Sequence, residues 1–100
     1  MKIILTSVVR RINKLKQSLL RRMPNGLSNW FEKDVVSFLK ERGFQFYEMR
    51  KGSHYAYINK ITGKIVEINI PKDAYIPRTL ETMIRQSGIS KKEWRDWAGK

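Results

Sequence analysis

The sequence predicts an α+β domain in which two helices cover one face of a three-stranded antiparallel sheet. Three observations support this: helical periodicity before residue 43 and after residue 78, alternating periodicity between them, and short turns that separate three strand-like segments. Consecutive strands joined by short turns form an antiparallel meander, and such a sheet buries one face against helices. The expected order is helix, three strands, helix, in a two-layer sandwich.

Length and composition limit the class of protein. At 100 residues the chain has the size of one domain, and its apolar fraction of 41% is typical of globular proteins. The absence of cysteine excludes disulfides and thiolate sites, so a reducing, cytoplasmic location is the simplest expectation. A formal net charge of +12 favours nucleic acid as the partner, with an anionic membrane surface second and an acidic protein compatible with either.

The first 28 residues are expected to form a basic segment of their own, followed by the domain at 29–100. Residues 1–31 hold seven basic residues and no acidic one, and apolar residues recur at helical spacing from Ile4 to Met23. This predicts a basic amphipathic helix that covers the domain or extends from it as an arm, contacts nucleic acid, lies on a membrane surface, or serves as a transit peptide. Its candidate RNA contacts are Arg10, Arg11 and Lys14.

A turn at Pro24-Asn25-Gly26 separates this segment from the domain. Asn29 and Glu32 have the spacing of a capping box, in which each side chain satisfies a backbone donor at a helix start. A helix is therefore predicted from about Trp30 to Arg42, with Gly43 at its end. No apolar run in the chain approaches the roughly 20 residues of a membrane-spanning helix, so a membrane is not an expected partner.

Alternation begins at Phe44 and predicts three strands. Within each strand, the residues expected on one side are Phe44, Phe46, Glu48 and Arg50 in the first, His54, Ala56 and Ile58 in the second, and Val66, Ile68 and Ile70 in the third. Glu67 and Asn69 are expected on the opposite side of the third strand, which Pro71 ends. The turns between the strands fall at Lys51-Gly52-Ser53 and Thr62-Gly63-Lys64.

Two further helices complete the expected domain. After a loop from Pro71 to Arg78, helical spacing returns at Thr79, and Gly88 is expected to end that helix. Ser90 and Glu93 form a second capping box, which starts a short last helix. Its two tryptophans, Trp94 and Trp97, share one face and are expected to pack against the domain.

The residue types present exclude most catalytic classes. One histidine and no cysteine leave no ligand set for a metal ion, and no cofactor is expected. A phosphate-binding glycine loop is absent, because Gly52 and Gly63 are isolated turn glycines. Ser53 is adjacent to His54 and points to the opposite side of a regular strand, so a serine triad is not expected.

His54 is instead a candidate for cleavage of RNA. RNA brings its own nucleophile, the 2′-hydroxyl, and needs from the protein a proton acceptor, charge stabilisation and alignment. An imidazole has an ordinary pKa of about 6.5 and is available as a neutral base near pH 7. The predicted phosphate-binding turn is Arg50, Lys51, Gly52 and Ser53. A solvated surface histidine with no catalytic role is the competing interpretation.

Short motifs along the chain suggest a family. They are Gly43-Phe44, Arg50-Lys51-Gly52-Ser53-His54, Asn59, Thr62-Gly63-Lys64, Ile70-Pro71, Thr79-Leu80 and Ile84-Arg85-Gln86-Ser87-Gly88-Ile89-Ser90. In this order they resemble the HicA family of small toxin ribonucleases, over roughly residues 33–97. The resemblance implies a fold similar to double-stranded-RNA-binding domains, translation-independent mRNA cleavage, His54 as the catalytic residue, and a HicB antitoxin as protein partner.

The sequence departs from the family's pattern near its last loop. Lys72 and Arg78 stand near positions where family members often have a histidine and a glycine, and Glu81 stands where a basic residue is common. Substrate contacts of that loop are therefore not carried over. Two other functions stay open: a non-catalytic RNA-binding module with a double-stranded-RNA-binding-like fold, and a basic peripheral protein held by its N-terminal helix.

Overall fold

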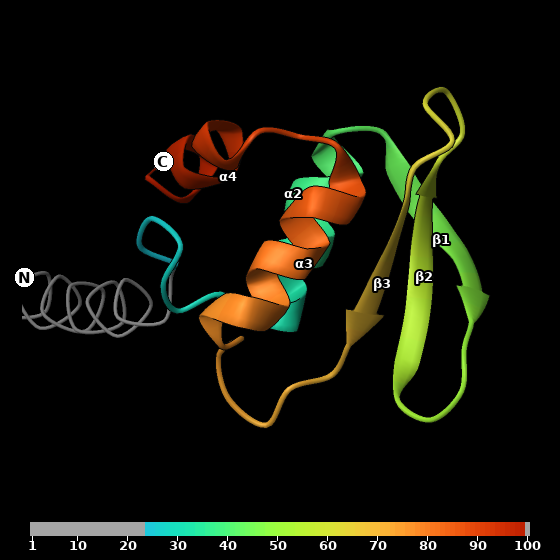
Figure 1. The fold of residues 1–100 in the computed structure, drawn as a ribbon, viewed down its shortest axis with the longest axis horizontal. Coiled ribbons are helices and arrows are strands. Elements are labelled where there is room, and N and C mark those ends of the chain that lie inside the picture. Colours follow the sequence, from blue (N-terminus) through green and yellow to red (C-terminus); the bar gives the residue numbers. More distant parts are fainter. Residues whose placement is uncertain (1–23, 100) are drawn as a thin grey trace, which may run out of the picture.

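The fold, in a computed structural model that describes residues 24–99, is α+β with a three-stranded antiparallel sheet (Figure 1). Its elements are α2 (Glu32–Glu41), β1 (Phe44–Met49), β2 (His54–Asn59), β3 (Ile65–Asn69), α3 (Pro77–Ser87) and α4 (Lys91–Ala98). This order confirms the predicted succession of helix, three strands and two helices. The expected N-terminal helix, with Arg10, Arg11 and Lys14, lies outside the described residues.

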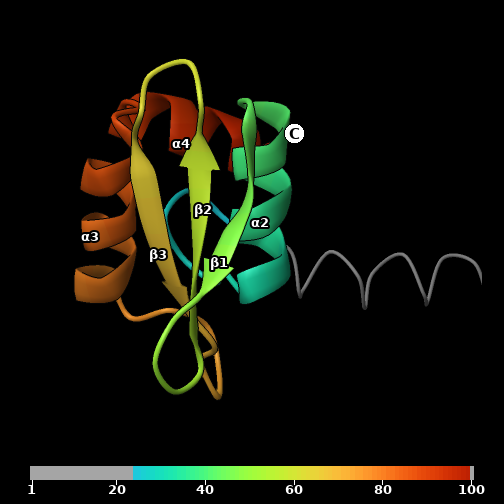
Figure 2. The same cartoon turned by 90° about the vertical axis from the view of Figure 1, so that its right-hand side faces the viewer.

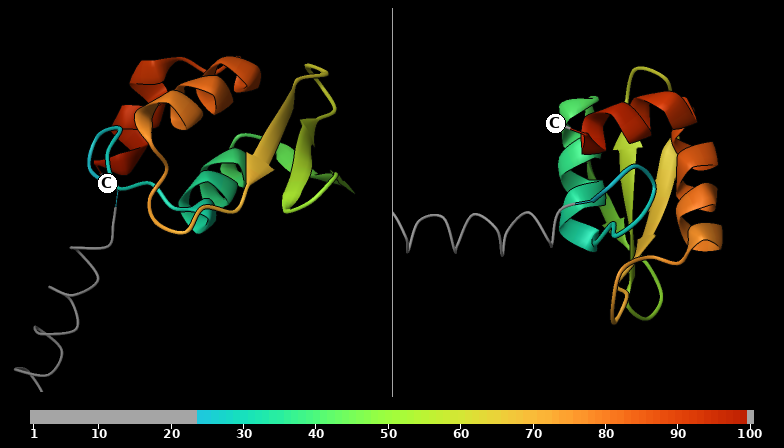
Figure 3. Two further views of the ribbon diagram at one scale, coloured as in Figure 1. Left: turned by 60° about the horizontal axis from the view of Figure 1, so that its bottom comes forward. Right: turned by 90° about the vertical axis from the view of Figure 1, so that its left-hand side faces the viewer.

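Helices α2 and α3 lie on the same side of the sheet, and no described helix covers the other face (Figure 1). Seen from that open face, α3 runs beside β3 and α2 beside β1 (Figure 2). Helix α4 crosses from α3 towards α2 on the side away from the sheet (Figure 3). No helix in the described part of the chain is long and apolar enough to cross a membrane.

The pairing of β2 with β3 decides which side chains face the helices. Tyr57 lies opposite Val66 and Tyr55 opposite Ile68, and both aliphatic side chains are fully buried. Because sides alternate along a strand, His54 and Glu67 project from the open face. This confirms the faces predicted for the second and third strands.

Strand β1 departs from the predicted alternation. A bulge between Phe46 and Glu48 inserts one extra residue relative to β2, so Met49 rather than Glu48 shares the side of Phe46. The expectation that Glu48 and Arg50 follow Phe44 and Phe46 on one side is therefore wrong beyond the bulge. Only Phe44 of this edge strand is buried, and a strand with so little burial specifies its register weakly.

An aromatic cluster forms the part of the core farthest from the sheet. Trp30, Phe38 and Trp94 are fully buried, and the ring centroids of Phe38 and Trp94 lie 4.3 Å apart. The Trp30 ring lies 5.3 Å from Trp97, and its indole N–H donates to the Gly26 carbonyl at 2.8 Å. Both tryptophans of α4 thus pack against the domain, as predicted.

Helix α2 begins later than predicted, because its N-cap is Phe31 rather than Asn29. Asn29 has φ of 62°, in the left-handed region, and precedes the helix. The Asp34 carboxylate accepts a hydrogen bond from the Phe31 backbone N–H at 2.9 Å and so satisfies one donor at the helix start. Trp30 therefore lies before the helix, where its side chain enters the aromatic cluster.

Helix α3 begins at Pro77, two residues before the predicted Thr79. Proline suits the first helical position, because a backbone N–H at that position has no hydrogen-bond partner within the helix and its absence costs nothing. The helix ends at Gly88, whose φ of 71° is the left-handed cap that the sequence predicts. In α4 the Ser90 hydroxyl accepts a hydrogen bond from the Glu93 N–H at 3.2 Å, which confirms its predicted cap.

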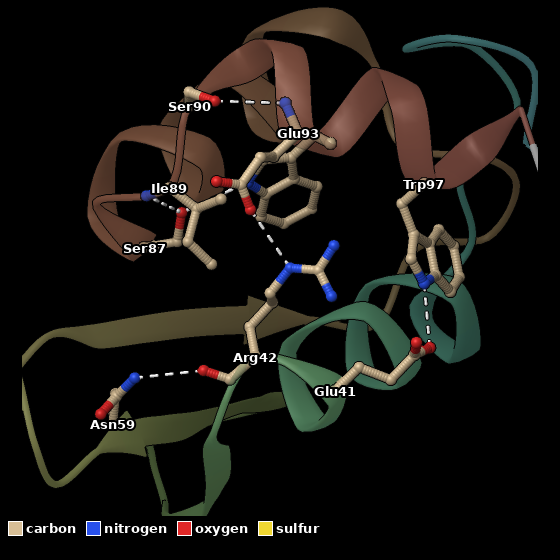
Figure 4. Close-up of polar contacts among 9 residues, drawn as sticks. Glu41, Arg42, Asn59, Ser87, Ile89, Ser90, Glu93 and Trp97 are labelled. Atoms are coloured by element: carbon tan, nitrogen blue, oxygen red, sulfur yellow. Dashed lines mark hydrogen bonds and ion pairs between the residues drawn. The ribbon is translucent and has the colours of Figure 1, made fainter.

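Polar contacts attach α4 and the β2–β3 hairpin to the end of α2 (Figure 4). The Arg42 Nε lies 3.2 Å from the Glu93 carboxylate, and the Trp97 indole N–H donates to Glu41 at 2.9 Å. The Asn59 amide donates to the Arg42 carbonyl at 3.2 Å. The C-terminal end of α2 is thus bonded both to α4 and to strand β2.

We expect Trp30→Ala to lower the free energy of unfolding by roughly 3–5 kcal/mol, because the substitution empties the centre of the aromatic cluster. Chemical denaturation measures this loss. Ile61→Ala is the control, since Ile61 is 95% exposed and should change stability by less than about 0.5 kcal/mol. A similar small loss for both variants would contradict the central place of Trp30.

Candidate functional site

The single histidine of the chain begins strand β2, immediately after the β1–β2 turn. The turn closes through a hydrogen bond from the Arg50 N–H to the His54 carbonyl at 2.8 Å. Gly52 has φ of 72°, a left-handed conformation that glycine adopts without strain. The imidazole consequently lies exposed at the start of a strand whose backbone is fixed on both sides.

Glu67 of β3 lies beside this imidazole on the open face of the sheet. His54 Nδ1 and Glu67 Oε1 are 3.4 Å apart, and the two side chains are 46% and 45% exposed. A carboxylate at Nδ1 favours the tautomer with its proton on that nitrogen, which leaves Nε2 as the basic atom. At 3.4 Å the contact is an ion-pair distance, and catalytic hydrogen bonds often tighten only when substrate binds. In this arrangement Nε2 could accept a proton while the carboxylate orients the ring.

Both residues line a cleft of about 430 Å³ between the β2–β3 strands and helix α3. The wall on the α3 side presents the guanidinium-bearing residue Arg78 and the hydroxyl-bearing residues Thr79 and Thr82. Figure 2 shows the ribbons of β3 and α3, the elements that contribute most of the lining residues, side by side. The structure therefore combines a histidine, a carboxylate, a cation and hydroxyls in one solvent-accessible cleft.

Helix α3 is fixed to the strand that carries Glu67. The Gln86 side chain accepts a hydrogen bond from the Glu67 backbone N–H at 2.9 Å, and β3 is an edge strand whose outward donors have no strand partner. Leu80, Met83 and Ile84 are buried in the core beneath the helix. The two walls of the cleft are held at a fixed separation by these contacts.

The cations predicted to bind phosphate do not line this cleft. The Arg50 Nη2 lies 3.3 Å from Glu48 Oε1, and Lys51 is exposed in the turn. Gly52 and Ser53 are likewise outside the cleft, so the assignment of this turn as the phosphate site stays a prediction. Arg78 lines the cleft with His54 and forms no ion pair within residues 24–99.

Sequence analysis assigned no role to Glu67, Arg78, Thr79 or Thr82. Alternation placed Glu67 on the outward side of its strand, but its position beside His54 depends on the register between β2 and β3. The position of Arg78 depends on how α3 packs along β3. Neither relation is contained in a local sequence pattern.

Two tyrosines at the same end of the sheet have structural roles. Burial, together with a hydrogen bond to Glu32, raises the pKa of Tyr55 far above its ordinary value. Burial also raises the pKa of Tyr75, whose hydroxyl donates to the Asn69 carbonyl at 2.6 Å. Both phenols are therefore protonated near neutral pH and serve as donors that connect elements, not as bases.

Comparison of the chain with known protein families gives no match, and comparison with characterised proteins gives none either. Within residues 24–99, no three His, Asp or Glu side chains come together as potential metal ligands. A function can therefore be inferred only from the geometry of the His54 cleft and from the motif resemblance.

Proposed function

We propose that the chain is a HicA-like RNA endonuclease that cleaves mRNA without a metal ion and uses His54 as its catalytic residue. One observation carries the proposal: the only histidine is exposed in a cleft, with a carboxylate 3.4 Å from its Nδ1 and a guanidinium group on the facing wall. This set contains the proton acceptor and the positive charge that phosphodiester transfer requires.

In this mechanism the RNA supplies the nucleophile. Nε2 of His54 takes the proton of a 2′-hydroxyl while O2′ forms a bond to the adjacent phosphorus. The bond from phosphorus to the 5′ oxygen breaks, and that oxygen takes a proton from water. The products are one fragment with a 2′,3′-cyclic phosphate and one with a 5′-hydroxyl, and the imidazolium then returns its proton to solvent.

Several broader features support the proposal. The succession of helix, three antiparallel strands and helix is compatible with the double-stranded-RNA-binding-like fold that the family resemblance implies. The net charge of +12 suits a polyanionic substrate. A HicB-type antitoxin that neutralises the ribonuclease, and action on cytoplasmic mRNA, complete the proposal. A non-catalytic RNA-binding module, the alternative, would bind RNA and leave it intact.

We expect His54→Ala and His54→Gln to lower RNA cleavage in EDTA by on the order of 10²- to 10⁴-fold, because neither variant carries a proton acceptor near neutral pH. Gel analysis of a labelled RNA, with chemical mapping of the fragment ends, measures both rate and product type. The same RNA with 2′-O-methyl groups is the control and should stay intact. Cleavage by either variant at the parent rate would refute the histidine mechanism, and binding without cleavage by the parent would favour the alternative.

RNA affinity should fall steeply as salt rises, because each phosphate that a cation neutralises releases condensed counterions. For a single strand the logarithm of the association constant falls by about 0.7 per phosphate contact for each logarithmic unit of salt. Fluorescence anisotropy with a labelled, 2′-O-methylated RNA measures this slope without cleavage. An affinity that is the same at low and moderate salt would remove the electrostatic basis of the proposal.

A further inference from the structure

We infer that Arg78 binds the scissile phosphate in the cleft and that Glu67 positions the His54 imidazole for proton transfer. The inference rests on the proposed RNA cleavage and adds its phosphate ligand and its positioning residue. It moves the phosphate site from the β1–β2 turn, where the sequence suggested it, to the first turn of α3.

Among the described residues, Arg78 is the cation that lines the cleft with His54. Arg50 already has an anionic partner, since its Nη2 lies 3.3 Å from Glu48 Oε1. Lys51 belongs to the turn and does not line the cleft that contains the imidazole. Arg78 lines that cleft and has no ion-pair partner in the described part of the chain. A guanidinium group can donate two parallel hydrogen bonds to one phosphate, which a lysine ammonium group cannot do.

The backbone of Arg78 is held in place by helix α3. Its backbone lies in the first turn of α3, next to Pro77, and its carbonyl accepts a hydrogen bond from the Thr82 hydroxyl at 3.1 Å. Helix α3 in turn is attached to β3 through Gln86. A cation on a packed helix keeps its distance from a base on a neighbouring strand more precisely than one in an exposed turn. Thr79, on the same turn and in the same cleft, adds a hydroxyl that can donate to a phosphate oxygen.

Glu67 makes two separate contacts, one through its backbone and one through its carboxylate. Its backbone N–H donates to Gln86 at 2.9 Å, and its carboxylate lies 3.4 Å from His54 Nδ1. The backbone contact fixes the strand against the helix that carries Arg78. The carboxylate contact favours the imidazole tautomer with its proton on Nδ1, which leaves Nε2 as the basic atom of a residue that lines the cleft. Glu67 thus acts on the reaction through His54 and not by touching the substrate.

The test of Arg78 compares variants of the full chain in cleavage and in binding. Arg78→Ala should lower kcat by on the order of 10²-fold or more, the loss typical for removal of one donor that stabilises transition-state charge. Arg78→Lys should recover part of that loss, because it keeps the charge but not the paired donors. Arg85→Ala is the matched control: it removes the same side chain from an exposed position of the same helix that does not line the cleft.

The binding arm uses a short, fully 2′-O-methylated RNA, which the enzyme cannot cleave. Arg78→Ala should weaken binding of this RNA more than Arg85→Ala does at the same salt concentration. A kcat for Arg78→Ala close to that of Arg85→Ala, or a larger loss for Lys51→Ala, would overturn the assignment and leave the role of His54 intact. If the parent binds this RNA but cleaves no RNA, the proposed function is wrong. In that case, equal RNA affinities of Arg78→Ala and Arg85→Ala would refute the phosphate contact of Arg78 as well.

The test of Glu67 reads the imidazole directly. Nitrogen-15 NMR of the single histidine distinguishes the two neutral tautomers without any substrate. The parent should show the proton mainly on Nδ1, and Glu67→Ala should move it towards Nε2 while the fold, checked by thermal unfolding, persists. Glu67→Ala should also cleave RNA more slowly than the parent. Glu67→Asp, which keeps a carboxylate, should recover part of that loss. Identical tautomer populations in the parent and Glu67→Ala would refute the positioning role.

Discussion

The register between β2 and β3 is the constraint on which the rest of the molecule depends. In this register Tyr57 faces Val66 and Tyr55 faces Ile68, so one face of the hairpin carries the residues that the helices cover. A shift of β3 by one residue against β2 would turn Val66 and Ile68 to solvent and Glu67 to the side that the helices cover, away from His54. The hydrophobic requirement that folds the sheet is therefore also the requirement that places the histidine and its carboxylate on the open face.

The aromatic cluster has a different effect, because it sets the positions of the helices. Trp30, Phe38 and the two tryptophans of α4 join the segment before α2, α2 itself and α4 into one packed unit. Gly88 turns the chain sharply from α3 into α4, so α3 is held at one end by this unit and along its length by β3. A cleft between a helix and a strand keeps its width only if both are fixed, and here the Gln86–Glu67 hydrogen bond at the cleft and the aromatic cluster away from it both hold α3.

Local chemistry was enough to predict most of the fold. Gly88 as a helix end, Ser90 as a helix start and the turn at Gly52 were recognisable because each depends on a few neighbouring residues. The start of α2 was wrong, because Asn29 fits the pattern of a cap while burial of Trp30 requires the helix to begin later. The bulge in β1 was missed, since an edge strand with one buried residue leaves the alternation undetermined. His54 was found as the only residue of its kind, whereas its neighbours in the cleft come from elements that meet only in the folded chain.

If the proposed RNA substrate binds in the cleft, the charges around it would favour approach from the α3 side. Glu48 and Glu67 both pair with Ala56 across the sheet, so two carboxylates lie in a row on the open face. A phosphate placed over that row would meet like charge, even with Arg50 beside Glu48. Arg78 lies on the other wall, so in the proposed enzyme the charges would direct a phosphate towards α3 and past the imidazole. In the proposed enzyme, the many remaining cations would supply affinity, whereas this asymmetry would determine which phosphate meets the base.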